Sequence, residues 1–216
     1  MSSFIRSLEV HKRIFNAPEI WPQKATGFQD RSALGPYATL VQKLNNLRQE
    51  QGSGLVVTFA SVSNGEGVTS VVESLSRELA QYAGQGVIVT SPAALEGAHV
   101  PFRITEPIDP RRVWRLGAAV PAPWHTQEED PLDTLRHMRE RFGFILVDCP
   151  PLSVSSAIFS AAPVSDGVVL VVAAGQTKRR DVEEARRLLA AASVPIVGMV
   201  LNKHENYVPK FLSSLF

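Results

Sequence analysis

A chain of 216 residues is long enough to bury one substantial core, and its shares of 44% apolar and 20% charged residues are ordinary for a globular domain. A net charge of +1 excludes a general electrostatic attraction to nucleic acid or to an anionic membrane, so no nucleic-acid partner is expected. The single cysteine, Cys149, excludes an internal disulfide, and no window approaches the roughly 20 apolar residues of a membrane-spanning helix. The expected location is the cytoplasm.

Two terminal segments flank the central part of the chain. Residues 1–33 are predicted to form an N-terminal arm, since Pro18 and Pro22 interrupt any long helix there. Residues 206–216 are predicted to form a C-terminal tail with several apolar side chains. Each segment either docks on a partner or packs on its own domain, and packing is favoured for both. Residues 34–205 are predicted to form one domain.

Strands and helices alternate along this domain. Nearly continuous apolar runs predict strands over residues 55–60, 87–90, 113–116, 144–149, 168–173 and 196–201. Apolar residues at helical spacing predict helices over residues 32–49, 67–83, 131–141, 154–163 and 181–192. The rest of residues 92–130 is predicted to be irregular. The alternation indicates an α/β fold with a doubly wound, mostly parallel sheet flanked by helices, like that of P-loop NTPases.

The stretch VTFASVSNGEGVTS, residues 57–70, has the layout of a phosphate-binding P-loop: a strand, a turn that contains glycines, and then a helix. Gly65 and Gly67 allow successive N–H groups to face one concavity, and the helix N-terminus adds partial positive charge. Thr69 and Ser70 offer hydroxyls, one of which would ligate Mg²⁺. The lysine that reaches the outer phosphates is replaced by Val68, so the motif is degenerate.

Two interpretations of this loop remain open. Either Asn64–Ser70 binds phosphate through its backbone alone, or it is a turn kept for folding. Loss of the lysine removes a charge-assisted contact worth about 1.5–3 kcal/mol, which corresponds to roughly tenfold to a hundredfold in affinity. The second interpretation is favoured: ATP or ADP with Mg²⁺ would be a weak ligand, and no cofactor is expected to bind tightly.

A second candidate site is Asp148, at the carboxyl end of a strongly apolar strand and before two prolines. An acid at this place in an open α/β sheet holds Mg²⁺ or polarises water. The alternative is an acid that caps the following turn. Asp148 is therefore the one candidate catalytic residue, if the protein is active, and Thr69 and Asp148 are the candidate metal ligands, if Mg²⁺ binds.

These stretches together resemble the cytoplasmic kinase domain of bacterial tyrosine kinases (BY-kinases), which belong to the MinD/ParA-type P-loop group. The resemblance covers roughly residues 32–205. RFGFILVDCPP, residues 141–151, resembles the Walker B strand, and Asp166–Val172 followed by Thr177 resembles the next strand and turn. VGMVLN resembles the strand whose final asparagine, Asn202 here, lies beside the base, and Asn64–Ser70 resembles the PGEGKST loop with Gly65, Glu66 and Gly67 retained.

The chain departs from the BY-kinase pattern mostly at functional positions. Val68 stands for the loop lysine, and the two aspartates of the Walker A-prime motif fall at about Ser91 and Ala93. The acid that follows the double proline falls near Ser156 or Ala157. The oligomerisation helix, at residues 35–41, lacks its Glu and Arg residues, and the C-terminal tyrosine cluster is reduced to a single tyrosine.

The resemblance implies a role in exopolysaccharide or capsule biosynthesis and export, and the departures imply a non-catalytic or weakly nucleotide-binding scaffold or regulator. Its implied partner is a membrane-embedded polysaccharide co-polymerase (a chain-length regulator) or an active kinase paralogue, which would hold it at the inner face of the membrane. One alternative is a divergent ATP-dependent tyrosine kinase or ATPase of the same pathway, with Lys203 as a replacement cation. A second is a MinD/ParA-like positioning ATPase, whose additional lysine falls at about Ser63. Whether the protein is an enzyme stays open, and a pseudokinase is favoured.

Overall fold

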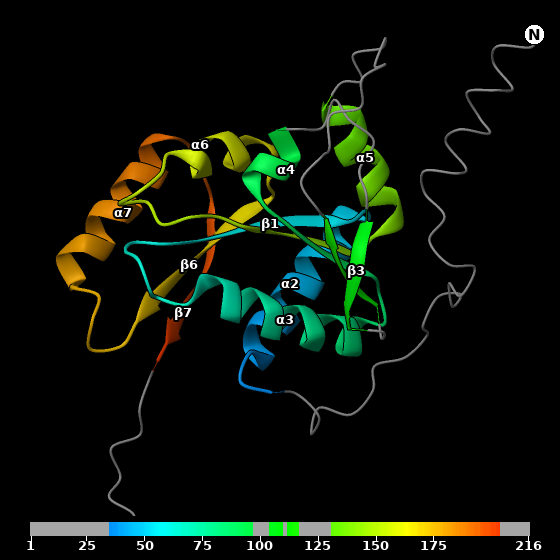
Figure 1. The fold of residues 1–216 in the computed structure, drawn as a ribbon, viewed down its shortest axis with the longest axis horizontal. Helices are drawn as coiled ribbons and strands as arrows, with labels where there is room; N and C mark the ends of the chain where they lie inside the picture. The colour runs from blue at the N-terminus through cyan, green and yellow to red at the C-terminus, as the bar shows by residue number, and fades with distance from the viewer. Residues whose placement is uncertain (1–34, 97–103, 110–111, 117–130, 204–216) are drawn as a thin grey trace, which may run out of the picture.

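The structure is a computed structural model that describes residues 35–96, 104–109, 112–116 and 131–203 (Figure 1). The N-terminal arm predicted for residues 1–33 and the C-terminal tail predicted for 206–216 lie outside the described residues. Their docking or packing therefore stays a prediction, as does the division of the chain into arm, domain and tail.

Within the described residues, seven strands form one sheet in the order β3-β4-β2-β5-β1-β6-β7. Six of them are parallel: β1 Leu55–Ser61, β2 Val87–Thr90, β4 Val113–Leu116, β5 Phe144–Asp148, β6 Gly167–Ala173 and β7 Ile196–Asn202. The strand β3 Ile104–Asp109 pairs antiparallel with β4 at one edge. The predicted α/β fold with a mostly parallel sheet is confirmed.

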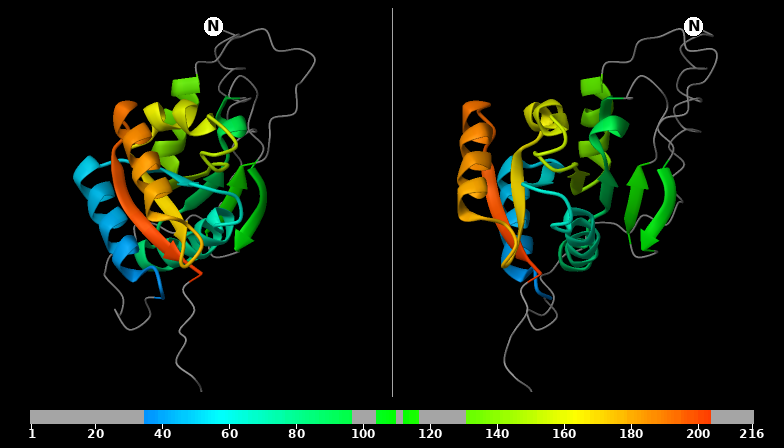
Figure 2. Two further views of the ribbon diagram at one scale, coloured as in Figure 1. Left: turned by 90° about the vertical axis from the view of Figure 1, so that its left-hand side faces the viewer. Right: turned by 60° about the vertical axis from the view of Figure 1, so that its left-hand side comes forward.

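Helices cover both faces of this sheet (Figures 1 and 2). They are α2 Ala38–Gln51, α3 Val68–Ala83, α4 Pro92–Glu96, α5 Pro131–Arg141, α6 Ala157–Ala161 and α7 Arg179–Ala191. Side chains alternate between the faces: Phe144 and Leu146 of β5 pack in the apolar cluster under α2 and α3, whereas Ile145 and Val147 pack in the cluster that includes residues of α5, α6 and α7. The core therefore lies on both sides of a buried sheet.

The differences from the predicted elements have local causes. The helix α2 runs past the predicted end to Gln51, because Gly52 adopts φ 73° and its N–H caps the carbonyl of Arg48. The helix α6 is shorter than predicted and continues as a 3-10 turn, Ala162–Val164, because Pro163 cannot continue an α-helix. The helix α4 and the strand β3 lie in the stretch predicted to be irregular, so that prediction was wrong there.

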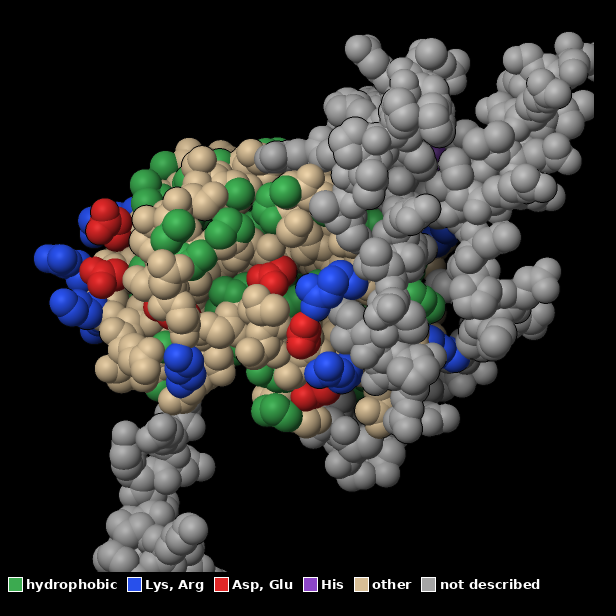
Figure 3. All heavy atoms as spheres, in the orientation of Figure 1, with side chains coloured by type: hydrophobic (Ala, Val, Ile, Leu, Met, Phe, Trp, Pro, Cys, Tyr) green, Lys and Arg blue, Asp and Glu red, His purple; other side chains and the backbone are tan. Residues whose placement is uncertain are grey.

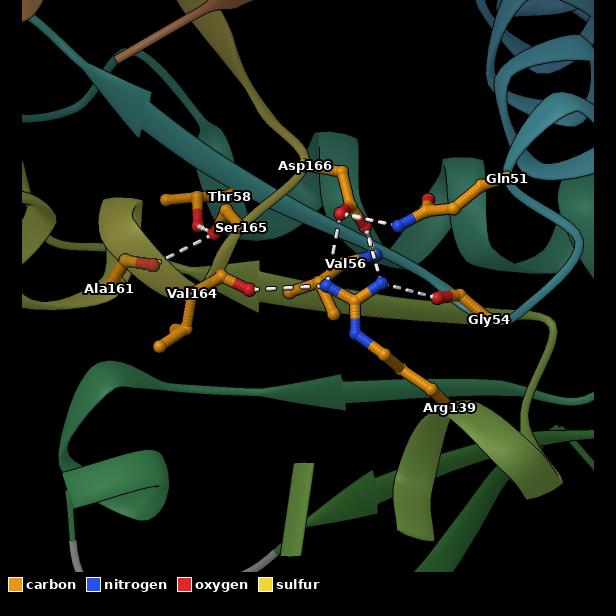
Figure 4. Close-up of polar contacts among 9 residues, drawn as sticks. All are labelled: Gln51, Gly54, Val56, Thr58, Arg139, Ala161, Val164, Ser165 and Asp166. Atoms are coloured by element: carbon orange, nitrogen blue, oxygen red, sulfur yellow. Dashed lines mark hydrogen bonds and ion pairs between the residues drawn. The ribbon is translucent and has the colours of Figure 1, made fainter. Parts of the chain in front are cut away.

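An ion pair and its hydrogen bonds connect the amino ends of the central strands β1 and β6 to α5 (Figure 4). Arg139 of α5 makes a bidentate contact with Asp166, with N···O distances of 2.8 and 3.0 Å, and also donates to the carbonyl of Gly54 at 2.8 Å. Asp166 accepts further hydrogen bonds from the Val56 N–H and from the Gln51 side chain, both at 2.7 Å. This network fixes α5 and β6 against β1.

Candidate functional site

The predicted P-loop connects β1 to α3 at the carboxyl edge of the parallel strands, next to the end of β5. Gly65 and Gly67 have φ of 78° and 89°, a backbone conformation that favours glycine. A Cβ on Gly67 would lie 2.4 Å from the amide nitrogen of Asn202, so it would displace the side chain that donates to the Glu66 carbonyl. A cavity of about 400 Å³ opens here, and it is lined by Ser61, Asn64, Gly65, Glu66, Gly67, Val68, Thr69, Asp148, Cys149, Pro150 and Pro151.

A buried carboxylate holds the loop from within. Glu66 is only 3% exposed, and its Oε2 accepts hydrogen bonds from the N–H groups of Val62 at 2.7 Å and Ser63 at 3.1 Å. Its Oε1 is hydrogen-bonded to the hydroxyl of Thr177, which in turn accepts a hydrogen bond from the Ala173 N–H at 2.9 Å. The loop is thereby attached to the turn between β6 and α7. This anchoring role was not predicted, because the resemblance identified Glu66 only as a retained position of the loop motif.

The last residue of β7 makes a second attachment to the loop. The Asn202 side chain donates a hydrogen bond from Nδ2 to the backbone carbonyl of Glu66 at 2.8 Å and packs against Gly67. The resemblance placed this asparagine beside the base, and the structure brings it to the loop backbone. Glu66 and Asn202 thus attach the loop to the turn after β6 and to the end of β7.

Backbone donors remain available on the cavity side of the loop. The first hydrogen bond of α3 runs from the Val71 N–H to the Gly67 carbonyl, and no side chain caps the helix start. The N–H groups of Val68, Thr69 and Ser70 precede that bond and have no intrahelical acceptor. Since residues 64–69 line the cavity, the loop and helix start can accommodate an anion by backbone contacts alone.

Val68, at the lysine position, is 7% exposed and belongs to the apolar cluster under α3, together with Val57 and Val71. Its aliphatic side chain therefore contributes to the core at the helix start. It supplies no charge to the cavity that it borders. Lys203, the replacement cation of the kinase alternative, lines a different groove between α2 and β7 and is not among the residues that line the loop cavity.

The predicted pair of metal ligands is brought together. The Thr69 hydroxyl donates a hydrogen bond to Asp148 Oδ2 at 2.8 Å. Burial raises the pKa of Asp148, the hydrogen bond from Thr69 and the charge of Arg115 act in the opposite direction, and the charge of Glu73 raises it further. Among the described residues, no group of three or more His, Cys, Asp or Glu side chains could hold a metal ion. Mg²⁺ would find two protein oxygens here and would take its other ligands from water or a bound phosphate.

The positions of the missing aspartates have other local roles. Ser91 follows β2, and its hydroxyl oxygen accepts a hydrogen bond from the Ala94 N–H at 3.3 Å, which caps the start of α4. Ala93 is exposed. Neither position offers a carboxylate to the site.

An ion pair that sequence reasoning missed lies on the same face of the sheet. Arg115 of β4 contacts Glu73 of α3 at 2.5 Å. Acidic and basic side chains lie next to one another near the middle of the face in Figure 3. No local pattern in the sequence pairs these two residues, because they lie on different elements and are 42 positions apart. Cys149 is 3% exposed, and burial together with the nearby Asp148 charge raises the pKa of its thiol to about 12, so the thiol is not a nucleophile near neutral pH.

Comparison with known sequences finds no matching family model. Tyrosine-protein kinase CpsD of Streptococcus pneumoniae serotype 4 is 30% identical over 82 residues, which are 37% of this chain and 35% of the relative. Tyrosine-protein kinase CpsD of Streptococcus agalactiae is 36% identical over 72 residues, 32% of this chain and 31% of the relative. The match thus spans about a third of the length of these curated relatives.

Three solved structures show the same fold at low identity. The VpsO kinase domain aligns with a TM-score of 0.54 at 21% identity and covers 79% of this chain and 100% of that domain. The kinase domain of Escherichia coli tyrosine kinase ETK gives 0.53 at 15% identity, with 84% and 86% covered. The septum site-determining protein MinD of Pyrococcus horikoshii, complexed with Mg-ADP, gives 0.50 at 20%, with 74% and 76% covered.

The predicted resemblance to bacterial tyrosine kinases is confirmed by the sequence matches, and the likeness to MinD is one of fold. In the described part of the chain, no helix has both the length and the apolar character needed to cross a bilayer.

Proposed function

We propose, on the premise that this chain is a relative of the bacterial tyrosine kinases, that it is a non-catalytic or weakly nucleotide-binding protein that acts as a scaffold or regulator in exopolysaccharide or capsule biosynthesis and export. It acts at the inner face of the membrane, bound to a membrane-embedded polysaccharide co-polymerase or to an active kinase paralogue. The pathway and the partners are those that the resemblance to bacterial tyrosine kinases implies.

The observation that carries the non-catalytic part of this proposal is the state of Val68. The loop around it keeps its left-handed glycines and its internal anchor, yet the side chain at the lysine position packs into the apolar core. A missing charge-assisted contact to phosphate lowers affinity by roughly tenfold to a hundredfold, from about 1.5–3 kcal/mol. Because phosphoryl transfer is catalysed almost entirely by positioning and charge stabilisation, the effect on catalysis is larger than the effect on binding.

The charged side chains of the Walker A-prime motif are absent as well, at about Ser91 and Ala93. Ser91 caps α4 and Ala93 is exposed, so neither offers a ligand to a metal or a base to an acceptor hydroxyl. A single oxygen pair, from Thr69 and Asp148, is left to hold Mg²⁺. These losses occur together while the sheet, the loop shape and Asn202 are kept, which favours a structural role for the site over turnover.

A second candidate function is a divergent ATP-dependent tyrosine kinase or ATPase. It is favoured by the backbone donors at the start of α3 and by the contact of 2.8 Å between the Thr69 hydroxyl and Asp148, since this is the pair that a Mg²⁺-nucleotide would need. A MinD/ParA-like positioning ATPase is supported only by the similarity of fold, because Ser63 stands where the additional lysine of that group would be.

Incubation of the purified chain with γ-labelled ATP and Mg²⁺ or Mn²⁺ tests the proposal. We expect no label on the protein, and none after Val68→Lys, because that change restores the lysine without restoring the acids near Ser91 and Ala93. The matched control is Asp148→Asn, which removes the carboxylate of the candidate Mg²⁺ ligand while Glu66 still holds the loop. Label on the unmodified chain that disappears in Asp148→Asn would overturn the proposal, whereas label that survives in the control would come from a contaminating kinase.

A further inference from the structure

The two edge strands of the sheet, β3 and β7, differ in composition and in the regularity of their pairing. At one edge β3 pairs antiparallel with β4, and its register shifts on either side of Pro107. Proline and irregular register are features that prevent an edge strand from pairing with another chain. At the other edge lies β7, whose seven residues, IVGMVLN, include no proline and no charged side chain. Within the described residues, nothing pairs with the outer side of β7.

The face of β7 next to α7 exposes apolar side chains. Met199 is 48% exposed and Leu201 is 58% exposed, and they are the register partners of the buried Leu170 and Val172 of β6. The apolar cluster formed by β6 and α7 therefore continues outward onto β7 and ends there in the open. A long, apolar and uncharged edge of this kind invites pairing with another strand.

The opposite face of β7 borders a groove of about 580 Å³. This groove runs between β7 and α2, and its walls include Tyr37 and Leu40 of the helix side and Val200 of the strand. Since side chains alternate along a strand, an added strand would send one set of side chains into this groove and the other set over Met199 and Leu201.

We propose that residues 204–216 of this chain cover β7 by pairing antiparallel with it. Lys203, directly after β7, has φ 56°, the left-handed conformation found in tight turns. A strand long enough to pair with all seven residues of β7, together with a turn of about two to five residues, requires no more than the 13 residues that follow Lys203. A strand that leaves from the edge itself also pairs at a smaller cost in loop-closure entropy than a distant segment would.

The composition of residues 207–212, YVPKFL, fits an edge strand of this sheet. Pro209 and Lys210 are residues that protect edges, and β7 lacks both kinds. Val208, Phe211 and Leu212 are apolar and suit the two faces described above. A turn with an even number of residues, centred between His204 and Glu205, would place Val208 directly opposite Leu201. The Cα–Cα distance of two directly opposite residues is one that a disulfide can bridge.

A strand paired with β7 would also affect the motion of the loop that lines the cavity. Asn202 is the last residue of β7, and its amide holds the Glu66 carbonyl at 2.8 Å. A strand paired along β7 restricts the motion of Asn202 and thereby of the loop.

Hydrogen exchange of the full chain and of a chain that stops after Lys203 tests this pairing. The outward-facing amides of β7 should exchange at least tenfold faster in the shortened chain, while the amides of the central strand β1 stay unchanged and show that the shortened chain is folded. Equal exchange of β7 in both chains would overturn the proposal, including the case in which the N-terminal arm covers the edge. Protection that rises with protein concentration would also overturn it, because a second copy would then be the occupant.

A disulfide test uses the full chain and does not depend on truncation. The double variant Leu201→Cys/Val208→Cys should form an intramolecular disulfide on mild oxidation, and Cys149 will not compete because it is buried. The matched control is Val154→Cys/Val208→Cys, since Val154 is as exposed, at 62%, but lies in the loop after β5. Equal rates in the two variants, or disulfide-linked dimers in the first, would contradict the proposal.

Discussion

Replacement of Glu66 measures how far the loop depends on its internal carboxylate. In Glu66→Ala the N–H groups of Val62 and Ser63 lose their acceptor, and the Thr177 hydroxyl loses its partner. A buried donor left without a partner costs about 1–3 kcal/mol. Because the adjoining cavity admits water to part of this space, we expect a total loss of about 2–4 kcal/mol in the free energy of unfolding.

The assay is thermal and urea unfolding of the full chain. A loss of about 2–4 kcal/mol corresponds to a decrease of roughly 4–16 °C in the midpoint of thermal unfolding for a chain of this size. Glu66→Gln keeps an oxygen for the two N–H groups but removes the charge, so it should lose about half as much. Glu184→Ala, on the exposed side of α7, is the control for the loss of an acid. If Glu66→Ala unfolds within about 0.5 kcal/mol of the unmodified chain, the anchoring role of Glu66 is refuted.

Three further predictions follow from other contacts. Arg139→Met should lower the free energy of unfolding by about 2–4 kcal/mol, since it leaves Asp166 partly buried without its cation; a double-mutant cycle with Asp166→Asn that shows no coupling would contradict this. Burial raises the pKa of Asp148 in the folded chain, so its ionisation disfavours folding as pH rises through and above the usual Asp range. Asp148→Asn should therefore be more stable than the parent at neutral pH, and the advantage should shrink as the pH falls below that range; an advantage independent of pH would contradict the assignment. Cys149, whose thiol pKa is about 12, should react with a thiol reagent at neutral pH only at the rate of unfolding, and rapid labelling of the folded chain would show that it is accessible.

The parts of the fold that the sequence predicts are those with strong local patterns. The apolar runs of β1, β5 and β6 are buried along nearly their whole length, and the glycines of the loop adopt the left-handed conformation that the P-loop layout requires. The helix α4 and the strand β3 were missed because they are short and their sequences, PAALE and ITEPID, carry no clear apolar period.

The site was predicted as a set of positions but not as a network. Thr69 and Asp148 are 79 residues apart, and the structure places them in hydrogen-bond contact because the loop after β1 and the end of β5 meet at the carboxyl end of the sheet. Their role as metal ligands stays a prediction. The contact between Glu66 and Thr177 spans 111 residues, and the ion pair between Arg139 and Asp166 depends on how α5 sits over β6. Such contacts are set by tertiary packing, which no local pattern in one sequence encodes.

Isothermal titration of the full chain with Mg-ATP tests the central claim, that the loop has kept its architecture and lost tight nucleotide binding. We expect no saturable heat at micromolar nucleotide, since Val68 supplies no charge and, among the described residues, Thr69 and Asp148 are the candidate ligands for Mg²⁺. Asp148→Ala, checked for folding by its thermal unfolding, serves as the comparison. Micromolar binding to the unmodified chain that is lost in Asp148→Ala would contradict the claim.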